Sequence, residues 1–322
     1  MRTLITGGAG FIGSHLAERL LAAGHLVDVI DDLSTGSLAN IETCLANPGF
    51  SFVNDTVLNE KMMYPLIERA DVIYHLAAAV GVELIVTQPV RTIETNIKGT
   101  EVVLDVARKF GRSVLVASTS EIYGKNEKVP FREDDDSLFG CTGYSRWSYA
   151  CSKAIDEFLA LAYHREFGLR VVITRFFNTV GERQTGQYGM VIPRFVKAAL
   201  AGEPIVIHGD GRQSRCFGYV GDVIDGITAL MDDPGAFGEV YNIGSTEEIT
   251  IEDLAGKIVE MTGSSSEIGH IPYDRVYGPG FDDMRRRVPS VEKIEKRVGW
   301  KARTSLDEIL SRVIEYYRGL EG

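Results

Sequence analysis

The chain has 322 residues and a formal net charge of −11, with 44% hydrophobic and 25% charged residues. A chain of this length can bury a large core, and this composition excludes a disordered or fibrous protein. The acidic balance argues against a general binder of nucleic acid or anionic membranes, because those partners need a basic footprint. An anionic ligand would therefore have to meet local clusters of arginine.

Cysteine and histidine spacing gives no sign of a metal site. The four cysteines show no CxxC spacing, and the six histidines show no HxxxH pair. We therefore expect reduced thiols and no bound metal. The chain opens directly into an apolar run without a signal-peptide pattern, and it has no membrane-length apolar stretch. These features predict a cytoplasmic protein.

A glycine-rich turn over residues 6–13 stands near the start of the chain. It follows the apolar pair Leu4-Ile5 and precedes a helical pattern over residues 14–23. In this arrangement glycines allow a tight turn and a close approach to a pyrophosphate, and the helix N-terminus offers N–H groups to the phosphates. The cofactor-binding residues predicted here are Gly7, Gly10, Phe11, Ile12 and Gly13.

The second predicted strand, over residues 26–30, ends in Asp31, eighteen residues past Gly13. A carboxylate there can accept hydrogen bonds from both ribose hydroxyls of NAD and would repel the 2′-phosphate of NADP. No Arg or Lys occurs from residue 24 to residue 59 to offset that repulsion. The sequence therefore predicts an NAD site.

Strand and helix patterns then alternate through the next hundred residues. Strands are predicted near 50–53, 70–76, 113–117 and 170–177, and helices near 90–110 and 148–167. This alternation predicts an α/β fold with a doubly wound parallel sheet, of the Rossmann type. Ligands of such sheets lie at the carboxyl ends of the strands, which points to residues 118–121. Asp55 follows the strand at 50–53, where it could reach an adenine amino group or simply cap a helix.

The alternation weakens after residue 180. The acidic run at 133–136 is predicted to be a solvated face. A helix near 221–231 and a strand near 240–243 are expected to return to the main sheet, and amphipathic helices are expected near 251–262 and 305–318. We predict a dinucleotide-binding domain over 1–180 with 216–245, and a smaller, interleaved C-terminal substrate lobe over 181–215 and 246–322.

Tyr149 and Lys153 lie four residues apart and therefore on one helical face. A neighbouring ammonium and a bound nicotinamide cation both favour the phenolate of a tyrosine. With Thr119 or Ser118 sharing the hydrogen bond, Tyr149 could remove a proton from a sugar hydroxyl while NAD oxidises the carbon.

With these motifs the chain resembles the extended short-chain dehydrogenase/reductase family of nucleotide-sugar epimerases, dehydratases and decarboxylases. The similarity covers nearly the whole chain and includes residues 6–13, 31–36, 75–78 and 209–215. It implies a tightly held NAD and a nucleoside-diphosphate sugar, usually a UDP-sugar, that is oxidised at C4. It also implies further cofactor contacts, at Asp32, Ser34, Thr35, Gly36, Thr56, Leu76, Ala77, Ala78, Asn96, Tyr149 and Lys153, and substrate contacts, at Ser120, Asn178, Arg194, Ile207 and Arg215.

Two stretches resemble the UDP-glucuronate decarboxylases within this family. The first is Thr119-Ser120-Glu121, and the second is residues 277–290, which carry Arg287 at the position of an active-site arginine. Oxidation of a glucuronate at C4 makes a β-keto acid, whose carboxylate leaves as its electrons flow into the new carbonyl. Glu121 and Arg287 could position that carboxylate and handle the proton at C5.

Two other functions are weighed against this one. Residues 186–190 are unlike either decarboxylase group, so a 4-epimerase of a UDP-uronate or UDP-hexose is the alternative. A non-catalytic NAD-sensing protein would normally lack the Tyr149 and Lys153 pair.

The helices near 93–110 and 150–167 carry apolar residues around more than one stripe, which predicts a homodimer joined through them. These residues are Val102, Val103, Leu104, Val106, Ile155, Phe158, Leu159 and Leu161.

Overall fold

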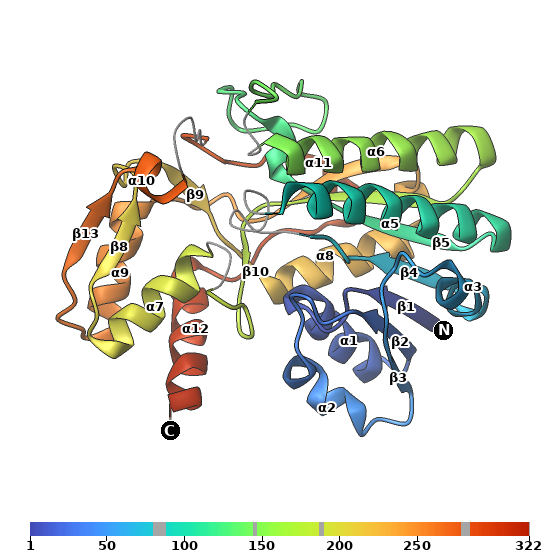
Figure 1. Ribbon diagram of the computed structural model, residues 1–322, viewed down its shortest axis with the longest axis horizontal. Helices are drawn as coiled ribbons and strands as arrows, with labels where there is room; N and C mark the ends of the chain where they lie inside the picture. Colours follow the sequence, from blue (N-terminus) through green and yellow to red (C-terminus); the bar gives the residue numbers. More distant parts are fainter. Residues whose placement is uncertain (80–87, 144–146, 187–189, 278–283, 322) are drawn as a thin grey trace.

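The computed structural model describes residues 1–79, 88–143, 147–186, 190–277 and 284–321 (Figure 1). The predicted doubly wound α/β fold is confirmed, because a seven-stranded sheet made only of parallel pairs forms the centre of this part of the chain. Among the same residues, no helix is long and apolar enough to cross a membrane.

The strand order of the sheet reverses next to the first strand. Across the sheet the strands are β11 (Glu239–Ile243), β6 (Val171–Phe176), β5 (Ser113–Thr119), β4 (Val72–His75), β1 (Arg2–Thr6), β2 (Leu26–Asp31) and β3 (Phe50–Asn54). The chain therefore winds outward in two directions from the boundary between β1 and β4. Open α/β sheets bind ligands at such a boundary, beyond the carboxyl ends of the strands.

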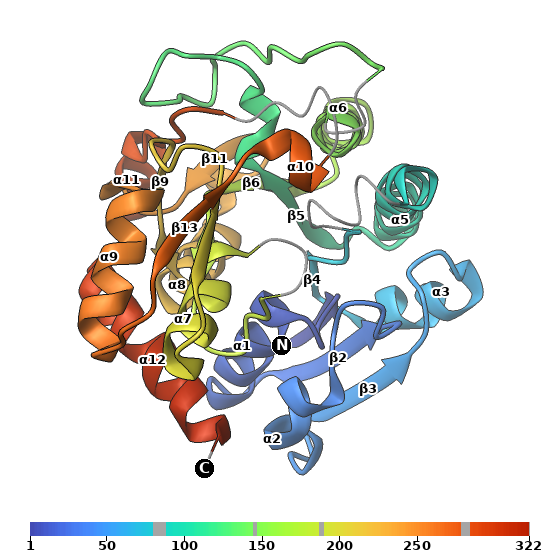
Figure 2. The ribbon, with the colours of Figure 1, turned by 60° about the vertical axis from the view of Figure 1, so that its left-hand side comes forward.

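Helices cover both faces of the sheet (Figure 2). Neighbouring strand residues point to opposite faces, so Leu4 packs with one helical layer and Ile5 with the other. One layer holds α3 (Glu60–Arg69), α5 (Pro89–Phe110) and α6 (Ser148–Phe167), and the other holds α1 (Phe11–Ala22), α8 (Val220–Asp232) and α11 (Glu292–Val298). Both α5 and α6 end at a glycine with a left-handed backbone, Gly111 and Gly168, as helices commonly do.

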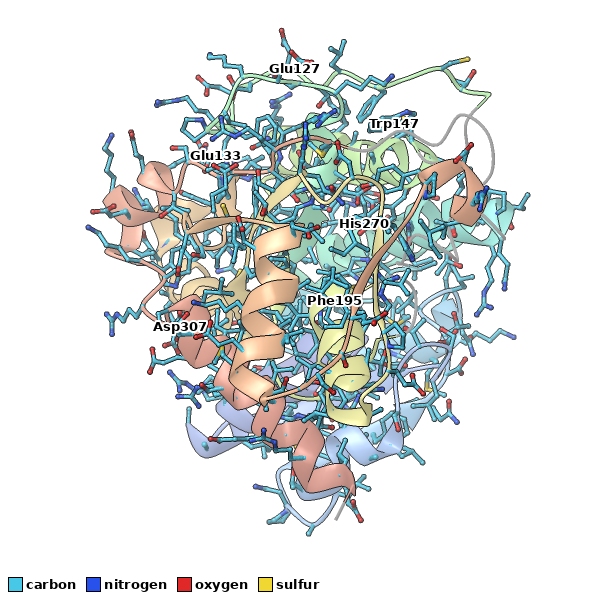
Figure 3. All side chains as sticks on the ribbon, turned by 90° about the vertical axis from the view of Figure 1, so that its left-hand side faces the viewer. Glu127, Glu133, Trp147, Phe195, His270 and Asp307 are labelled. Atoms are coloured by element: carbon cyan, nitrogen blue, oxygen red, sulfur yellow. The ribbon has the colours of Figure 1, made fainter. Side chains whose placement is uncertain are left out.

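A smaller lobe with its own core lies beside the large sheet, on the left of Figure 1. Phe195, labelled in Figure 3, is fully buried in that core. Two short pairings hold the lobe together, β8 with β13 in parallel and β9 with β12 antiparallel. Its elements are α7 (Val191–Ala201), β8 (Ile205–His208), β9 (Ser214–Cys216), β12 (Glu248–Thr250), α9 (Ile251–Thr262), β13 (Ile268–Ile271), α10 (Tyr273–Tyr277) and α12 (Leu306–Glu321).

Short elements complete the chain between these layers. They are α2 (Glu42–Leu45), β7 (Thr179–Val180), β10 (Gly218–Tyr219) and the 3-10 helices η1 (Leu38–Ile41), η2 (Ser120–Tyr123) and η5 (Pro234–Ala236). Strands β7 and β10 pair in parallel where the chain passes between the large sheet and the smaller lobe.

The segment around α11 departs from the predicted division of the chain. Ile294 and Trp300 pack with α8 in the core of the large lobe, and the Trp300 indole N–H donates to the carbonyl of Asp222 at 2.7 Å. This segment therefore contacts the dinucleotide-binding half, although residues 246–322 were assigned to the substrate lobe.

The acidic run at 133–136 is only partly solvated. Asp134 and Asp136 are exposed, as predicted, but the prediction is wrong for Asp135, whose side chain is 9% exposed, and for Glu133. Its Oε1 accepts a hydrogen bond from the backbone N–H of Asn242 at 2.8 Å, and burial raises its pKa. The reason is that Asn242 lies on the edge strand β11, whose backbone donors need a partner outside the sheet.

The apolar stripes on α5 and α6 do not all face outward. Val103, Leu104 and Val106 are buried in the molecule's own core, so they give no support to a second apolar face. On α6, by contrast, Ile155 and Phe158 are 46% and 75% exposed.

Candidate active site

A cavity of about 810 Å³ lies at the carboxyl end of the large sheet, with further walls from the smaller lobe. This volume is typical of sites for small molecules and cofactors. Most of the predicted site residues line it: Gly7, Gly10, Phe11, Ile12, Gly13, Asp31, Asp32, Ser34, Thr35, Asp55, Thr56, Leu76, Ala77, Ala78, Thr119, Ser120, Glu121, Tyr149, Asn178, Arg194, Arg215 and Arg287.

The glycine turn leaves no space for side chains. A Cβ on Gly7, whose φ is 71°, would lie 2.8 Å from the backbone nitrogen of Ala77, and one on Gly13 would lie 2.3 Å from the carbonyl oxygen of Gly7. Gly36 does not line the cavity, but a Cβ there would lie 3.0 Å from Asp31 Oδ1. The turn therefore packs closely against the backbone that follows β4 and, at Ala9, against the loop that follows β2.

The Asp31 side chain organises the loop around the end of β2. It accepts hydrogen bonds from the backbone N–H of Ala9 at 3.0 Å and of Leu33 at 2.8 Å. Burial raises its pKa. Each carboxylate oxygen can accept more than one hydrogen bond, so capacity remains for ribose hydroxyls. Together with the glycine cradle, this residue fits a dinucleotide.

Three other predicted residues lie behind the cavity wall. Asn96 accepts from the backbone N–H of Ala79 at 2.8 Å and donates to the Ser152 hydroxyl at 3.1 Å, which ties the chain after β4 to α6. The Ile207 side chain is buried in the core of the smaller lobe, whereas its neighbour His208 lines the cavity. The third is Lys153.

Tyr149 and Lys153 occupy different depths. Tyr149 lines the cavity, whereas the Lys153 side chain is only 3% exposed and its Nζ lies 2.7 Å from Asp156 Oδ2. The Thr119 hydroxyl accepts from the backbone N–H of Glu121 at 3.3 Å and so begins η2. Thr119 at the end of β5 and Tyr149 at the start of α6 thus both line the cavity.

Ser118 is engaged in a separate buried network. Its hydroxyl donates to Glu157 at 2.6 Å, and Glu157 forms an ion pair with Arg175 at 2.8 Å. Of the two hydroxyls considered for the hydrogen bond with Tyr149, Thr119 is therefore the better candidate.

Glu121 and Arg287 meet on the cavity wall although they are far apart in the chain. Glu121 Oε1 lies 3.5 Å from Arg287 Nη2, and the two side chains are 13% and 9% exposed. A carboxylate and a guanidinium are thus held together close to the end of β5.

Backbone hydrogen bonds hold the chain on the C-terminal side of Arg287. The N–H of Phe131 donates to the carbonyl of Val288 at 2.8 Å, and the N–H of Ser290 donates back to Phe131 at 2.8 Å. The fully buried amide of Asn242 donates to the carbonyls of Phe131 and Ser290 at 2.9 and 3.2 Å.

A second set of bonds holds the N-terminal side. The backbone N–H of Ser214 donates to the carbonyl of Arg285 at 2.9 Å, and Arg215 Nη1 donates to the carbonyl of Met284 at 2.9 Å. Arg287 is therefore suspended between two anchored stretches of chain.

Charge is distributed unevenly around the cavity. The acids at the ends of β2 and β3 are Asp31, Asp32 and Asp55, whereas arginines line the walls from α5, α7, β9 and the stretch after residue 284: Arg91, Arg194, Arg215 and Arg287. The acidic chain thus offers an anion a local basic surface at one end of the cavity.

Sequence reasoning missed several lining residues. Arg91 belongs to no recognisable sequence motif. Tyr273 comes from α10, whose position depends on the tertiary fold. His208 follows the predicted Ile207, and burial together with Arg194 lowers its pKa to about 4. Other missed residues are Gln88, Thr95, Gln184 and Gln213. The resemblance over 278–283, and that part of 186–190 covering 187–189, lie outside the described residues.

Fold and site together define a dinucleotide-binding α/β protein with a second, arginine-lined end for another ligand. The chain belongs to the family described as GDP-mannose 4,6 dehydratase, which matches residues 4–313. The resemblance to the extended short-chain dehydrogenase/reductases is confirmed by this match and by the relatives below.

Relatives with two kinds of activity match nearly the whole chain. A UDP-N-acetyl-alpha-D-glucosaminuronate decarboxylase of Bacillus cytotoxicus is 42% identical, over 99% of this chain and 98% of the relative. A UDP-glucuronic acid decarboxylase of Danio rerio is 36% identical, over 98% of this chain and 72% of the relative. The crystal structure of a UDP-glucuronic acid 4-epimerase from Bacillus cereus, in complex with UDP-glucuronic acid and NAD, has a TM-score of 0.90 at 29% identity and covers 99% of this chain and 100% of its own.

Proposed function

We propose that the protein is an NAD-dependent enzyme that oxidises C4 of a UDP-uronate and releases the carboxylate as carbon dioxide. The observation that carries this proposal is the contact between Glu121 and Arg287 on the wall that also presents Thr119 and Tyr149. The names of the two decarboxylase relatives support it and suggest UDP-glucuronate and its 2-acetamido counterpart as substrates.

NAD, when bound, supplies the acceptor for the electrons that leave C4. The proposal assigns it to the turn of Gly7, Gly10 and Gly13 and to the Asp31 carboxylate, which fit a dinucleotide in shape and hydrogen-bonding capacity.

The side chains at the other end divide the remaining work. Tyr149 takes the proton of the C4 hydroxyl, Lys153 favours its phenolate, and Thr119 shares the hydrogen bond. Arg287 holds the substrate carboxylate while the bond from the carboxyl carbon to C5 breaks into the C4 carbonyl. Glu121 then handles the proton that C5 takes up.

The proposal places the diphosphate against Arg215 and Asn178. Arg215 lines the cavity while it holds the carbonyl of Met284. Asn178 has a positive φ of 34°, which an asparagine tolerates better than most residues, and its amide donates to the carbonyl of Cys216 at 3.0 Å.

A 4-epimerase is the second candidate, favoured by the similarity to the UDP-glucuronic acid 4-epimerase structure. In that reaction the 4-keto sugar turns over and is reduced on its other face. Glu121 would then bind a sugar hydroxyl, and no carbon would be lost.

Product mass distinguishes the two reactions. We would incubate the protein with NAD and either UDP-glucuronate or UDP-N-acetylglucosaminuronate, then measure the product mass and the released carbon dioxide. Loss of carbon dioxide supports the decarboxylase, whereas an isomer of unchanged mass shows the epimerase. In a decarboxylase, Glu121→Gln should leave C4 oxidation in place but slow the proton uptake at C5 that completes the decarboxylation. Enzyme-bound NADH should then accumulate in stopped-flow absorbance, because the steps that follow are delayed.

We also propose a cytoplasmic homodimer that pairs through α5 and α6, which lie side by side on the outside of the large lobe (Figure 1). The exposed Ile155 and Phe158, with Val90 at 69% exposure, support this apolar face. Light scattering at micromolar concentration should report a dimer that Phe158→Asp dissociates. The control Leu320→Asp, 63% exposed on α12, should stay dimeric.

A further inference from the structure

Lys153 and Asp156 form an ion pair inside α6, on adjacent turns of the helix. Nζ of Lys153 and Oδ2 of Asp156 are 2.7 Å apart, and the side chains are 3% and 0% exposed. Burying two charges costs desolvation free energy that only a close partner offsets, and an apolar residue at position 156 would avoid that cost. Stability alone therefore does not explain a carboxylate here.

The other ionisable groups around this pair have partners or are neutral. Burial, with a contribution from the nearby ammonium, lowers the pKa of His75 on β4 to about 3, so its ring is neutral near pH 7. On α6 itself, Glu157 is paired with Arg175 of β6. Burial raises the pKa of Asp156, and the Lys153 ammonium and the Thr100 hydroxyl of α5 act against that rise. The Thr100 hydroxyl also lies 3.1 Å from Nε2 of His75. Among the residues that the structure describes, Asp156 is the carboxylate in contact with the ammonium.

This carboxylate changes what the lysine does to the tyrosine. Tyr149 lies one turn before Lys153 on the same helical face. An ammonium near a phenol favours the phenolate, and a carboxylate against that ammonium cancels part of its field. On the cavity wall, Glu121 also carries a carboxylate, but it is paired with Arg287.

We propose that Asp156 is a positioning residue: it holds the Lys153 ammonium in place and thereby sets the pH range in which Tyr149 releases its proton. This inference rests on the proposed oxidation at C4, which the decarboxylase and epimerase reactions share.

The test replaces the carboxylate by an amide of the same shape, Asp156→Asn. We expect the pKa of the Tyr149 phenol to fall by about one unit, because the ammonium then acts unopposed. The readout is the absorbance of tyrosinate during a pH titration, with the titration of a Tyr149→Phe variant subtracted in each background. This titration needs no substrate, so its result does not depend on whether UDP-uronates are the substrates.

The pH profile of kcat should move with the titration. Its acid limb should shift to lower pH, because Tyr149 then releases its proton at a lower pH. Asp156→Glu keeps the charge and should restore a profile close to that of the wild type. An Asp156→Glu profile shifted as far as that of Asp156→Asn would show that the charge is not the cause and would overturn the proposal.

Asp28→Asn is the matched control. Asp28 is also buried, is paired with Arg2 and Arg69 at 3.0 and 2.8 Å, and does not line the cavity. This variant should lose stability but keep the wild-type titration of Tyr149. An unchanged titration in Asp156→Asn, or an equal shift in Asp28→Asn, would contradict the proposal.

A second variant, Asp156→Ala, is used if Asp156→Asn does not fold. If Asp156→Asn does not melt cooperatively, Asp156→Ala should show the same shift. If neither variant folds, Asp156 serves stability alone and the proposal is overturned.

Discussion

The two ends of the cavity are built in different ways. The cofactor end comes from successive strand ends near the start of the chain, and backbone packing at Gly7 and Gly13 sets its shape. At the other end, the side chain of Glu121, which follows β5, contacts the side chain of Arg287. Backbone hydrogen bonds hold the stretch of chain that carries Arg287. The first end depends on local chain geometry and the second on side-chain chemistry brought together by tertiary folding, so substitutions should separate binding from turnover.

The largest expected effect is that of Tyr149→Phe. This change removes the proton-accepting oxygen and leaves the glycine cradle untouched, so turnover should fall by about 10²–10⁴-fold while NAD binding is retained. Steady-state kinetics and a calorimetric titration with NAD measure the two quantities. Near-normal turnover would remove Tyr149 from the mechanism.

Arg287→Ala tests the other end more directly. If the substrate carboxylate is held by this guanidinium, its loss should cost about 2–5 kcal/mol in kcat/KM, because a desolvated carboxylate is left without its partner. Arg286 is the matched control, since its side chain is 56% exposed and pairs with Glu248 on the surface. Arg286→Ala should cost less than about 1 kcal/mol. Equal losses in the two variants would argue against a specific carboxylate contact.

The buried His75 should make the folded protein less stable in acid. Its Nδ1 lies 2.8 Å from the Thr6 hydroxyl, and its pKa is lowered from 6.5 to about 3, mainly by burial. Because the unfolded chain binds this proton first, stability is lost as the pH falls from about 6.5 towards 3. At pH 5 this amounts to about 2 kcal/mol.

Urea denaturation at pH 7 and pH 5 measures this effect. Between these two values the wild type should lose about 2 kcal/mol more of its unfolding free energy than His75→Gln, which cannot titrate. The same loss in both proteins would assign the acid sensitivity to other groups.

The smallest expected effect is on cofactor choice. Asp31→Asn removes the charge that repels a 2′-phosphate, so the ratio of NADP to NAD affinity should rise by about tenfold. The exposed neighbour Asp32 provides the comparison, and Asp32→Asn should change the ratio less. Equal affinity of the wild type for NAD and NADP would refute the predicted preference.

The same contrast explains what could be predicted from the sequence. The glycine turn and the acid at the end of β2 form a local pattern, and the alternation of strands and helices repeats along the chain. A shared role for Arg287 and Glu121 was expected from the resemblance only, and their contact was not predicted, since no local pattern reports on a contact across the fold.

Other features had no signal in the sequence at all. Glu133 satisfies a backbone donor on the edge strand β11, and that edge exists only once the sheet is assembled. Asp156 looks like an ordinary polar residue of a helix until its burial against Lys153 is known. The apolar stripes on α5 and α6 do predict a second apolar face, but only the packing of these helices decides that Val103 is buried and Phe158 exposed.

The anchoring of the stretch around Arg287 has a consequence for divergence and engineering. Phe131 and Asn242 hold it through its peptide groups, so the path of the chain does not depend on which side chain stands at position 287. Evolution or an engineer could exchange that one side chain, and with it the fate of the sugar, while the backbone keeps its course. Asn242, which does not line the cavity, is then the residue that such experiments have to leave unchanged.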